Sequence, residues 1–286
     1  MTAPIVVDAH HHVWDLAVRD QTWITGPALA PLRRDFSLRD LRPLAERAGV
    51  RASVLVQTVT VPEETPEMLA QAASDPLVAG VVGWTDLTAP DIADTLAELR
   101  GMPGGERLVG LRHQVQAESD SRWLLREDVL RGLAAVADAG LAYDLVVLPH
   151  QLPSATAAAR RLPGLTFVLD HAGKPAVATA ELEPWATDLR DLAAEPNVYC
   201  KLSGLVTEAD WPHWSVEDLR PYADTVLDAF GPERVMFGSD WPVCTLAADY
   251  ATVLDTTRRL TTRLDPHEQA RVLGDTALTV YRLTLP

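Results

Sequence analysis

Cysteine is scarce in this chain of 286 residues, which has only Cys200 and Cys244, far apart in the sequence. Two distant cysteines exclude a disulfide framework and are typical of a reducing compartment. The first residues include no basic segment followed by an apolar run, and no apolar stretch reaches the length of a membrane span. We therefore expect a cytoplasmic protein without a signal peptide or a membrane anchor.

Basic residues are also few, because 25 lysines and arginines stand against 40 aspartates and glutamates, which gives a formal net charge of −15. A protein that binds nucleic acid needs a basic face, so this charge argues against nucleic acid as a partner. The glycine-rich turn that binds a dinucleotide phosphate is missing after the first apolar run. We expect a small-molecule partner, and the sequence leaves a homo-oligomer open.

The chain is built from short apolar runs that alternate with longer amphipathic segments. Ile5-Val6-Val7 enters the first predicted strand, and the other strands are expected at residues 52–57, 78–83, 107–111, 141–148, 165–169, 198–202 and 234–238. Helices are expected at 38–48, 62–73, 91–100, 121–139, 154–162, 182–194, 216–230, 247–262 and 267–282. Ser37 is the expected N-cap of the first helix, and Gly49 follows its end. This alternation predicts one (β/α)8 barrel domain over residues 1–286, with a doubly wound open sheet as the alternative.

Three consecutive histidines end the first predicted strand. Side chains alternate between the two faces of a strand, so His10 and His12 point one way and His11 points the other way. Two imidazoles on one face can hold a metal ion. A polar strand end, with one histidine bonded to the backbone, is the simpler alternative.

Polar or aromatic side chains lie at the carboxyl end of nearly every predicted strand. Each has an ordinary explanation, such as a turn, a helix cap or a surface ion pair. In a barrel enzyme, however, catalytic side chains come from the carboxyl ends of several strands and converge on one mouth. The residues at these ends, with one inside the fifth strand, are His10, His12, Gln57, Trp84, Arg112, His113, Asp144, His171, Lys201 and Asp240.

These positions form motifs that resemble the amidohydrolase superfamily, and more narrowly its sugar-lactonase branch of fuconolactonases, rhamnonolactonases and pyrone-dicarboxylate lactonases. The motifs are Asp8-x-His10-x-His12, Arg112-His113, Asp170-His171-x-Gly173-Lys174-Pro175, Lys201-Leu202-Ser203-Gly204 and Gly238-Ser239-Asp240-Trp241-Pro242. The resemblance runs essentially from end to end of the chain. It implies a hydrolase in which the aspartate of the eighth strand activates water.

The resemblance also implies a divalent metal, held in much of the superfamily by the residues that correspond to His10, His12 and Asp240. His171 matches the histidine of the sixth strand. The chain departs from the binuclear pattern, since the fourth strand offers Arg112 and the fifth offers Asp144 where a ligand histidine is expected. One metal ion, or none, fits the sequence better than two, and the pyrone lactonases of this branch work without one.

The residues themselves suggest the chemistry of lactone hydrolysis. Asp240 is the candidate general base, because it is a carboxylate placed among histidines. If Zn²⁺ is bound by His10, His12 and Asp240, it lowers the pKa of water and polarises the carbonyl. If no metal is bound, a protonated histidine such as His171, together with Arg112, can stabilise the oxyanion. Both routes stay open at this stage.

The expected mouth of the barrel is rich in tryptophan and poor in arginine. Arg112 alone stands at a strand end, whereas binding a dicarboxylate calls for several arginines. Aromatic faces cover the C–H side of a sugar, and polar side chains bind its hydroxyls. We therefore expect a neutral aldonolactone as substrate. The residues expected to contact it are Trp14, Gln57, Trp84, His113, Asp144, Lys201 and Trp241. The alternatives are a lactone that carries carboxylates, a metal-dependent decarboxylase of the same superfamily, and a non-catalytic sugar-binding barrel.

Overall fold

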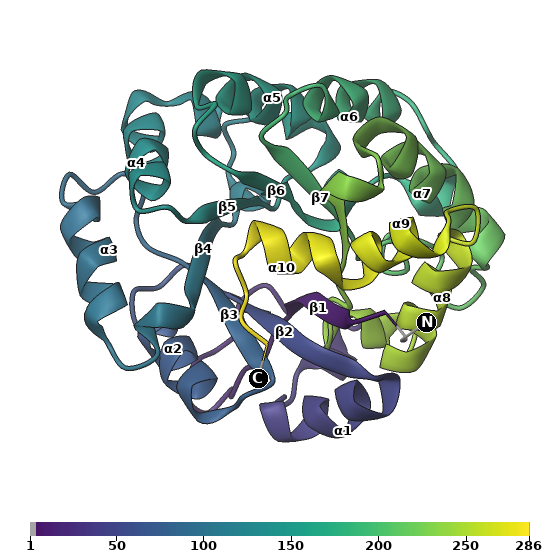
Figure 1. Ribbon diagram of the computed structural model, residues 1–286, viewed down its shortest axis with the longest axis horizontal. Coiled ribbons are helices and arrows are strands. Elements are labelled where there is room, and N and C mark those ends of the chain that lie inside the picture. Colours follow the sequence, from purple (N-terminus) through teal and green to yellow (C-terminus); the bar gives the residue numbers. More distant parts are fainter. Residues whose placement is uncertain (1–3, 286) are drawn as a thin grey trace.

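The computed structural model describes residues 4–285, in which eight parallel strands form one sheet in sequential order (Figure 1). The strands are β1 (Val6–His11), β2 (Val50–Val56), β3 (Val78–Gly83), β4 (Leu108–His113), β5 (Ala142–Leu145), β6 (Phe167–Leu169), β7 (Val198–Leu202) and β8 (Val235–Phe237). A parallel bridge between His11 and Trp241 brings the end of β8 back to β1 and closes the barrel. The prediction of a (β/α)8 barrel is confirmed.

Helices follow the strands; most of them cover the outside of the barrel, whereas α10 (Thr276–Val280) lies across one end of it. They are α1 (Leu38–Ala48), α2 (Glu64–Ser74), α3 (Ile92–Gly101), α4 (Glu127–Asp138), α5 (Leu152–Arg161), α6 (Trp185–Ala193), α7 (Val216–Phe230), α8 (Tyr250–Leu260), α9 (Pro266–Ala270) and α10 (Thr276–Val280). At the start of α1, the Asp40 carboxylate accepts hydrogen bonds from the backbone N–H and the hydroxyl of Ser37, at 2.8 and 2.7 Å. Gly49 ends this helix in the left-handed conformation, with φ 76°, as its position after the helix predicts. None of the helices in residues 4–285 has the length and apolar composition needed to span a bilayer.

The last predicted helix, residues 267–282, is interrupted in the structure. Between α9 and α10, residues Arg271–Asp275 form a π-helical turn. This turn passes the start of β1 so closely that a Cβ on Gly274 would lie 2.3 Å from the Ile5 carbonyl oxygen. A glycine allows this approach, and the helix is locally widened where it crosses the barrel end.

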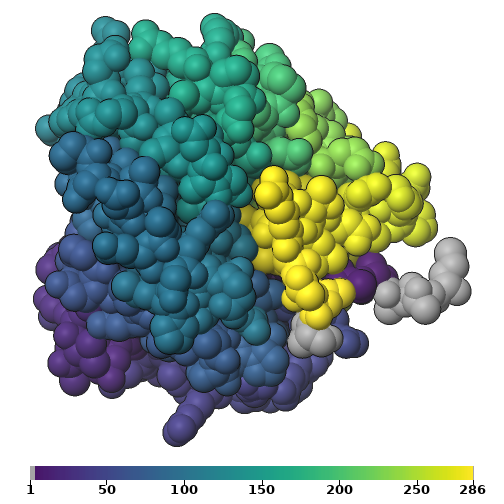
Figure 2. Space-filling model, turned by 60° about the vertical axis from the view of Figure 1, so that its left-hand side comes forward, coloured from purple at the N-terminus to yellow at the C-terminus, as the bar shows by residue number. Residues whose placement is uncertain are grey.

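The C-terminal segment closes the amino end of the barrel. Ala277 and Tyr281 belong to the apolar cluster inside the barrel, together with residues such as Val54 on β2 and Met236 on β8. Figure 1 shows α10 lying across the barrel, and Figure 2 shows the same segment packed against the rest of the molecule. The opposite, carboxyl end stays available for a site.

Candidate active site

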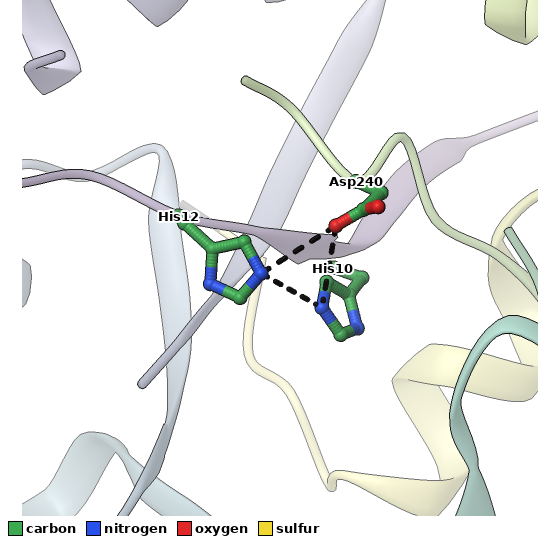
Figure 3. A group of neighbouring side chains, drawn as sticks. All are labelled: His10, His12 and Asp240. Carbon is green, nitrogen blue, oxygen red and sulfur yellow. Dashed lines mark hydrogen bonds and ion pairs between the residues drawn. The ribbon is translucent and has the colours of Figure 1, made fainter. Parts of the chain in front are cut away.

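Three side chains meet at the carboxyl end of the barrel: the imidazoles of His10 and His12 and the carboxylate of Asp240 (Figure 3). The Nε2 atoms of the two histidines lie 3.1 Å apart. Asp240 Oδ1 lies 3.8 Å from Nε2 of His10 and 3.5 Å from Nε2 of His12. All three side chains are buried. Their charges and lone pairs therefore act on one another with little screening by water.

The alternation of side chains along β1 decides which histidines share this site. His11 points away, and its Nε2 lies 3.0 Å from the hydroxyl oxygen of Ser53 on β2. Asp8 also lies outside the cluster. Its carboxylate accepts hydrogen bonds from the backbone N–H and the hydroxyl of Ser239, at 2.8 and 2.6 Å. Asp8 thus fastens β1 to the segment that carries Asp240.

Asp240 is held beside the histidines by the backbone hydrogen bonds that join β1 to the segment after β8 and close the barrel. Its backbone N–H donates to the carbonyl of His10 at 2.8 Å, and the N–H of His12 donates to the carbonyl of Trp241 at 2.7 Å. Asp240 has φ 55°, a left-handed conformation that is uncommon outside glycine. Gly238 allows this segment to approach β1, because a Cβ there would lie 2.8 Å from the Cβ of His10.

His171 reaches the cluster from the carboxyl end of β6. Its Nε2 lies 3.9 Å from Asp240 Oδ1, and its ring centroid lies 4.5 Å from that of His10. The Nδ1 atom faces the hydroxyl of Ser203 at 2.9 Å. Gly204 makes room for the ring, since a Cβ there would lie 2.7 Å from Nδ1 of His171. The predicted convergence of β1, β6 and β8 on one site is therefore present in the structure.

Arg112 extends from β4 into the same site and is held by two neighbours. Its Nη1 donates to Asp170 Oδ2 at 2.9 Å and lies 3.3 Å from Nε2 of His10. Its Nη2 donates to the carbonyl and the side-chain oxygen of Gln57, at 2.5 and 2.9 Å. The structure thus places Gln57 as a support for the guanidinium, in place of the predicted contact with substrate.

Lys201 and Asp144 lie deeper, below the histidines. The Lys201 ammonium lies 2.5 Å from Asp144 Oδ2 and 3.0 Å from Asp170 Oδ1, and the side chains of all three are fully buried. The same ammonium lies 3.2 Å from Nδ1 of His10. The hydroxyl of Tyr281 donates to the Asp144 carboxylate, at 2.8 and 2.9 Å from its two oxygens. In place of the predicted contacts with sugar hydroxyls, Asp144 and Lys201 form an ionic network that links the C-terminal segment to the site.

Burial and nearby charges set the protonation of the cluster. Burial lowers the pKa of His171 to about 4 and holds the pKa of His10 well below its usual value. Burial alone would raise the pKa of Asp240, but the neighbouring His171 and His12 outweigh it and lower that pKa. Burial raises the pKa of Asp144 to about 6. Near pH 7 the site therefore combines the neutral imidazoles of His10 and His171 with an ionised Asp240.

The cluster forms one wall of a cavity of about 130 Å³, which we call the catalytic cavity. It is lined by His12, Trp23, Thr58, Arg112, Gln114, Gln116, Val146, His171, Lys174, Asp240 and Val243. The sequence did not identify seven residues of this wall: Trp23, Thr58, Gln114, Gln116, Val146, Lys174 and Val243. Lys174 lies inside the motif that begins at Asp170. Thr58 and Gln116 lie just beyond strand ends, where the only available signal was closeness to a strand end.

His113 turns away from this cavity, since neighbouring residues on a strand face opposite sides and Arg112 faces inward. Its Nδ1 accepts a hydrogen bond from the indole N–H of Trp84 at 3.0 Å, and its Nε2 lies 2.8 Å from Glu118 Oε1. Its ring stacks on that of Trp123 at 4.2 Å. His113 and Trp84 thus belong to a packed cluster beside the site and do not line the catalytic cavity.

Two other tryptophans expected at the mouth are buried in packing. The indole N–H of Trp14 donates to the Arg34 carbonyl at 2.7 Å. The ring centroid of Phe36 lies 5.1 Å from that of Trp14 and 5.5 Å from that of Trp241. Edge-to-face packing of this kind stabilises the loop after β1 against the loop after β8. Neither Trp14 nor Trp241 lines the catalytic cavity.

The donor atoms of His10, His12 and Asp240 fit a divalent metal ion. Nδ1 of His12 faces the Val56 carbonyl oxygen at 2.7 Å, which fixes a proton on Nδ1 and leaves a lone pair on Nε2. Nε2 of His10 lies 3.1 Å from this lone pair, a separation at which the two nitrogens share either a proton or a cation. The separations of 3.1, 3.5 and 3.8 Å are close to the ligand spacing of about 3.3 Å around a tetrahedral zinc ion. The three residues can therefore hold one ion.

A parallel barrel whose carboxyl end gathers imidazoles around one carboxylate is the architecture of a barrel hydrolase. Residues 7–283 match the amidohydrolase family, and the chain belongs to it. The resemblance drawn from the motifs is thus confirmed.

Close relatives in that family carry more specific names. The chain is 42% identical to an L-fucono-1,5-lactonase of Burkholderia multivorans, over 98% of this chain and 97% of the relative. It is 40% identical to an L-fucono-1,5-lactonase of Burkholderia ambifaria, over 98% and 96%. The crystal structure of an amidohydrolase from Burkholderia multivorans with bound zinc has a TM-score of 0.92 at 42% identity, covering 98% of this chain and 100% of that one.

Proposed function

We propose that this protein hydrolyses sugar lactones, with Asp240 as the base that activates water. The observation that carries the proposal is the ionised Asp240 carboxylate, which faces the imidazoles of His10, His12 and His171. Asp240, His12 and His171 line a cavity whose other residues are largely neutral. A lactone is a cyclic ester, so its opening needs an activated water and a group that stabilises charge on the carbonyl oxygen. Both lie at this wall. The relatives named as L-fucono-1,5-lactonases support the same substrate class.

In the proposed reaction, Asp240 accepts a proton from water as the water oxygen bonds to the lactone carbonyl carbon. Arg112 and His171, which both line the catalytic cavity, stabilise the negative charge that develops on the carbonyl oxygen. The bond between that carbon and the ring oxygen then breaks. The protonated Asp240 returns its proton to the ring oxygen, which becomes a hydroxyl. The aldonic acid that forms loses its own proton to solvent, so each turnover acidifies the medium.

We further propose that one divalent ion, zinc, binds to His10, His12 and Asp240. The relative from Burkholderia multivorans with bound zinc supports this choice, as does the spacing of the donor atoms. When bound, the ion would lower the pKa of a water and polarise the carbonyl. Metal content of the purified protein, measured beside the activity of metal-depleted and zinc-reconstituted samples, tests this proposal. A metal-free sample with full activity would contradict a catalytic role for zinc and support charge stabilisation by Arg112.

The charges around the catalytic cavity favour a neutral substrate. Two cationic side chains line it among residues 4–285, and each already faces a carboxylate. Arg112 bonds to Asp170 at 2.9 Å, and the Lys174 ammonium lies 3.8 Å from Glu208 Oε1. A lactone that carries carboxylates would have to compete with these residues for its counter-charges. We therefore propose a neutral aldonolactone as the small-molecule partner, and a cytoplasmic location in keeping with two free, buried cysteines.

Proton release on addition of a lactone panel tests the proposed function. Neutral aldonolactones should be opened with a higher kcat/KM than lactones bearing free carboxylates, at equal and moderate ionic strength. If kcat/KM is more than about tenfold higher for the carboxylated lactones, near 1.4 kcal/mol in transition-state stabilisation, the proposed substrate class is wrong. Release of CO₂ from an aromatic carboxylate in place of lactone opening would identify a decarboxylase, and binding without turnover would indicate a sugar-binding barrel.

A further inference from the structure

A second hollow adjoins the catalytic cavity at the same end of the barrel; we call it the outer cavity. It measures about 310 Å³ and lies between the loops that follow β1, β2 and β4. Trp23, Thr58, Gln114 and Gln116 line both cavities. The residues that line only the outer cavity are Arg19, Asp20, Thr22, Val59, Thr60, Val61 and Ala117.

The lining of the outer cavity is neutral in effect. Its two charged residues are already paired, because Arg19 bonds to Glu67 at 2.9 Å and Asp20 accepts from Arg33 at 3.0 Å. What remains is threonine hydroxyls, glutamine amides and apolar side chains. Neutral donors and acceptors beside apolar surface recognise hydroxyl groups, whereas an ionic ligand needs an unpaired counter-charge.

Trp23 supplies the apolar surface at the border of the two cavities. Its ring is half-buried and packs edge-to-face on Trp14, with centroids 5.7 Å apart. Its indole N–H already donates to the Gln21 side-chain oxygen at 2.9 Å. The ring is thus fixed in place and offers carbon surface to a ligand, which suits the C–H side of a sugar.

A chain of amides runs from the outer cavity to the catalytic groups. The side-chain nitrogen of Gln116 donates to the side-chain oxygen of Gln114 at 3.1 Å. Gln114 in turn donates to the side-chain oxygen of Gln57 at 3.2 Å, which accepts from Arg112 at 2.9 Å. The amides at the border are therefore oriented by hydrogen bonds that lead back to Arg112, and the two cavities share one hydrogen-bonded wall.

We propose that the outer cavity is a second sugar subsite, which holds a glycosyl unit attached to the lactone while the lactone ring lies against Asp240. The inference rests on the proposed function and extends it, because it makes the lactone of a disaccharide acid a substrate. A monosaccharide lactone would fill the catalytic cavity of about 130 Å³ and leave the larger outer cavity of about 310 Å³ to water. The neutral lining, the fixed indole and the border amides all match a second sugar.

The test compares kcat/KM for a monosaccharide aldonolactone and for cellobionolactone in wild type, in two variants of the outer cavity and in one control variant. Ala117 is an exposed alanine at the end of the turn Val115–Ala117, and it lines only the outer cavity. Ala117→Trp should fill that cavity and lower kcat/KM for cellobionolactone at least about tenfold, with less than about a twofold change for the monosaccharide lactone. The matched control is Ala178→Trp, since Ala178 is an exposed alanine in the comparable turn Val177–Thr179 and lines a different groove.

Thr60→Val provides a second variant, of nearly the same size, which removes only a hydroxyl of the outer cavity. It should weaken cellobionolactone hydrolysis selectively. The inference is overturned if wild type opens the monosaccharide lactone but not cellobionolactone, or if Ala117→Trp affects both lactones equally. Failure to open either lactone would instead refute the proposed function, and the subsite with it. Loss of both activities in the Ala178→Trp control as well would show that the bulky side chain acts through the fold and would also count against the subsite.

Discussion

Replacing Lys201 by methionine should destabilise the fold strongly, because this lysine neutralises two buried carboxylates. The Lys201 ammonium lies 2.5 Å from Asp144 and 3.0 Å from Asp170, and no part of the three side chains is exposed. With Arg112, which bonds to Asp170 at 2.9 Å, the group holds two negative and two positive charges. Methionine keeps the apolar stem of lysine but leaves one negative charge uncompensated.

The structure sets the size of this effect. Removing one partner of a buried ion pair costs about 3–5 kcal/mol, so Lys201→Met should lower the free energy of unfolding by that amount near pH 8. Asp144→Asn in the same chain removes the surplus charge. The double variant should therefore be more stable than the sum of the single effects by at least about 1.5 kcal/mol, within the range of couplings measured between contacting residues.

The effect should also depend on pH, with a sign fixed by Asp144. Burial already raises the pKa of its carboxyl to about 6, and loss of Lys201 should raise it further. A carboxyl whose pKa is higher in the folded than in the unfolded state binds more protons when folded, so stability rises as pH falls. The deficit of Lys201→Met should therefore be larger at pH 8 than at pH 5.

Urea denaturation followed by tryptophan fluorescence and by circular dichroism measures these free energies, provided that the two signals change together. Lys174→Met is the matched control, because Lys174 is partly exposed and lies 3.8 Å from Glu208; it should cost less than about 1 kcal/mol. Two results would refute the reasoning: a cost for Lys201→Met no greater than that of the control, or strictly additive effects with Asp144→Asn.

Further predictions concern the site and its supports. Asp240→Asn should keep the fold and lose on the order of a thousandfold in kcat; a near-normal kcat would remove Asp240 from its assigned role. His10→Ala or His12→Ala should reduce metal content by elemental analysis, whereas His11→Ala should leave it nearly unchanged, and equal loss in all three would indicate general destabilisation. Burial lowers the pKa of His11 to about 3, so below pH 6.5 the unfolded chain binds a proton that the folded chain does not, and the free energy of unfolding decreases as the pH is lowered. In urea titrations, His11→Asn should reduce this pH dependence by about 1.4 kcal/mol per pH unit between pH 6 and 4. Tyr281→Phe should lower the free energy of unfolding by about 1.5–3 kcal/mol through the lost bond to a charged group, with KM unchanged in steady-state assays; a raised KM would mean that Tyr281 acts on substrate binding.

The alternation of apolar runs and amphipathic segments was enough to predict the barrel, because strands and helices differ in the period of their apolar residues. Short-range signals were also readable: Ser37 is the N-cap of α1 and Gly49 ends this helix, as expected. The same period-two rule separated His10 and His12 from His11, and the structure bears this out. These features depend on residues close together in the sequence, and local geometry governs them.

Only the tertiary structure decided what each strand-end side chain faces. Period two gives the face of a strand but not the depth of a residue inside the barrel, so Asp144 and Lys201 looked like substrate contacts although they lie in a buried ionic network. The partner that completes this network, Tyr281, is 137 residues from Asp144 in the sequence. No local pattern signals such a contact.

The same limit applies to the loops at the mouth. Trp14 and Trp241 pack on Phe36, while Gln116 lies at the border of the two cavities. Loop residues have no fixed period, so their side chains take the direction that packing against distant segments allows. The sequence by itself thus determined the barrel and the group of strand-end side chains, His10, His12, His171 and Asp240, that meet in it. The closure of the barrel, which joins segments more than two hundred residues apart, decided which residues support them and which can meet a substrate.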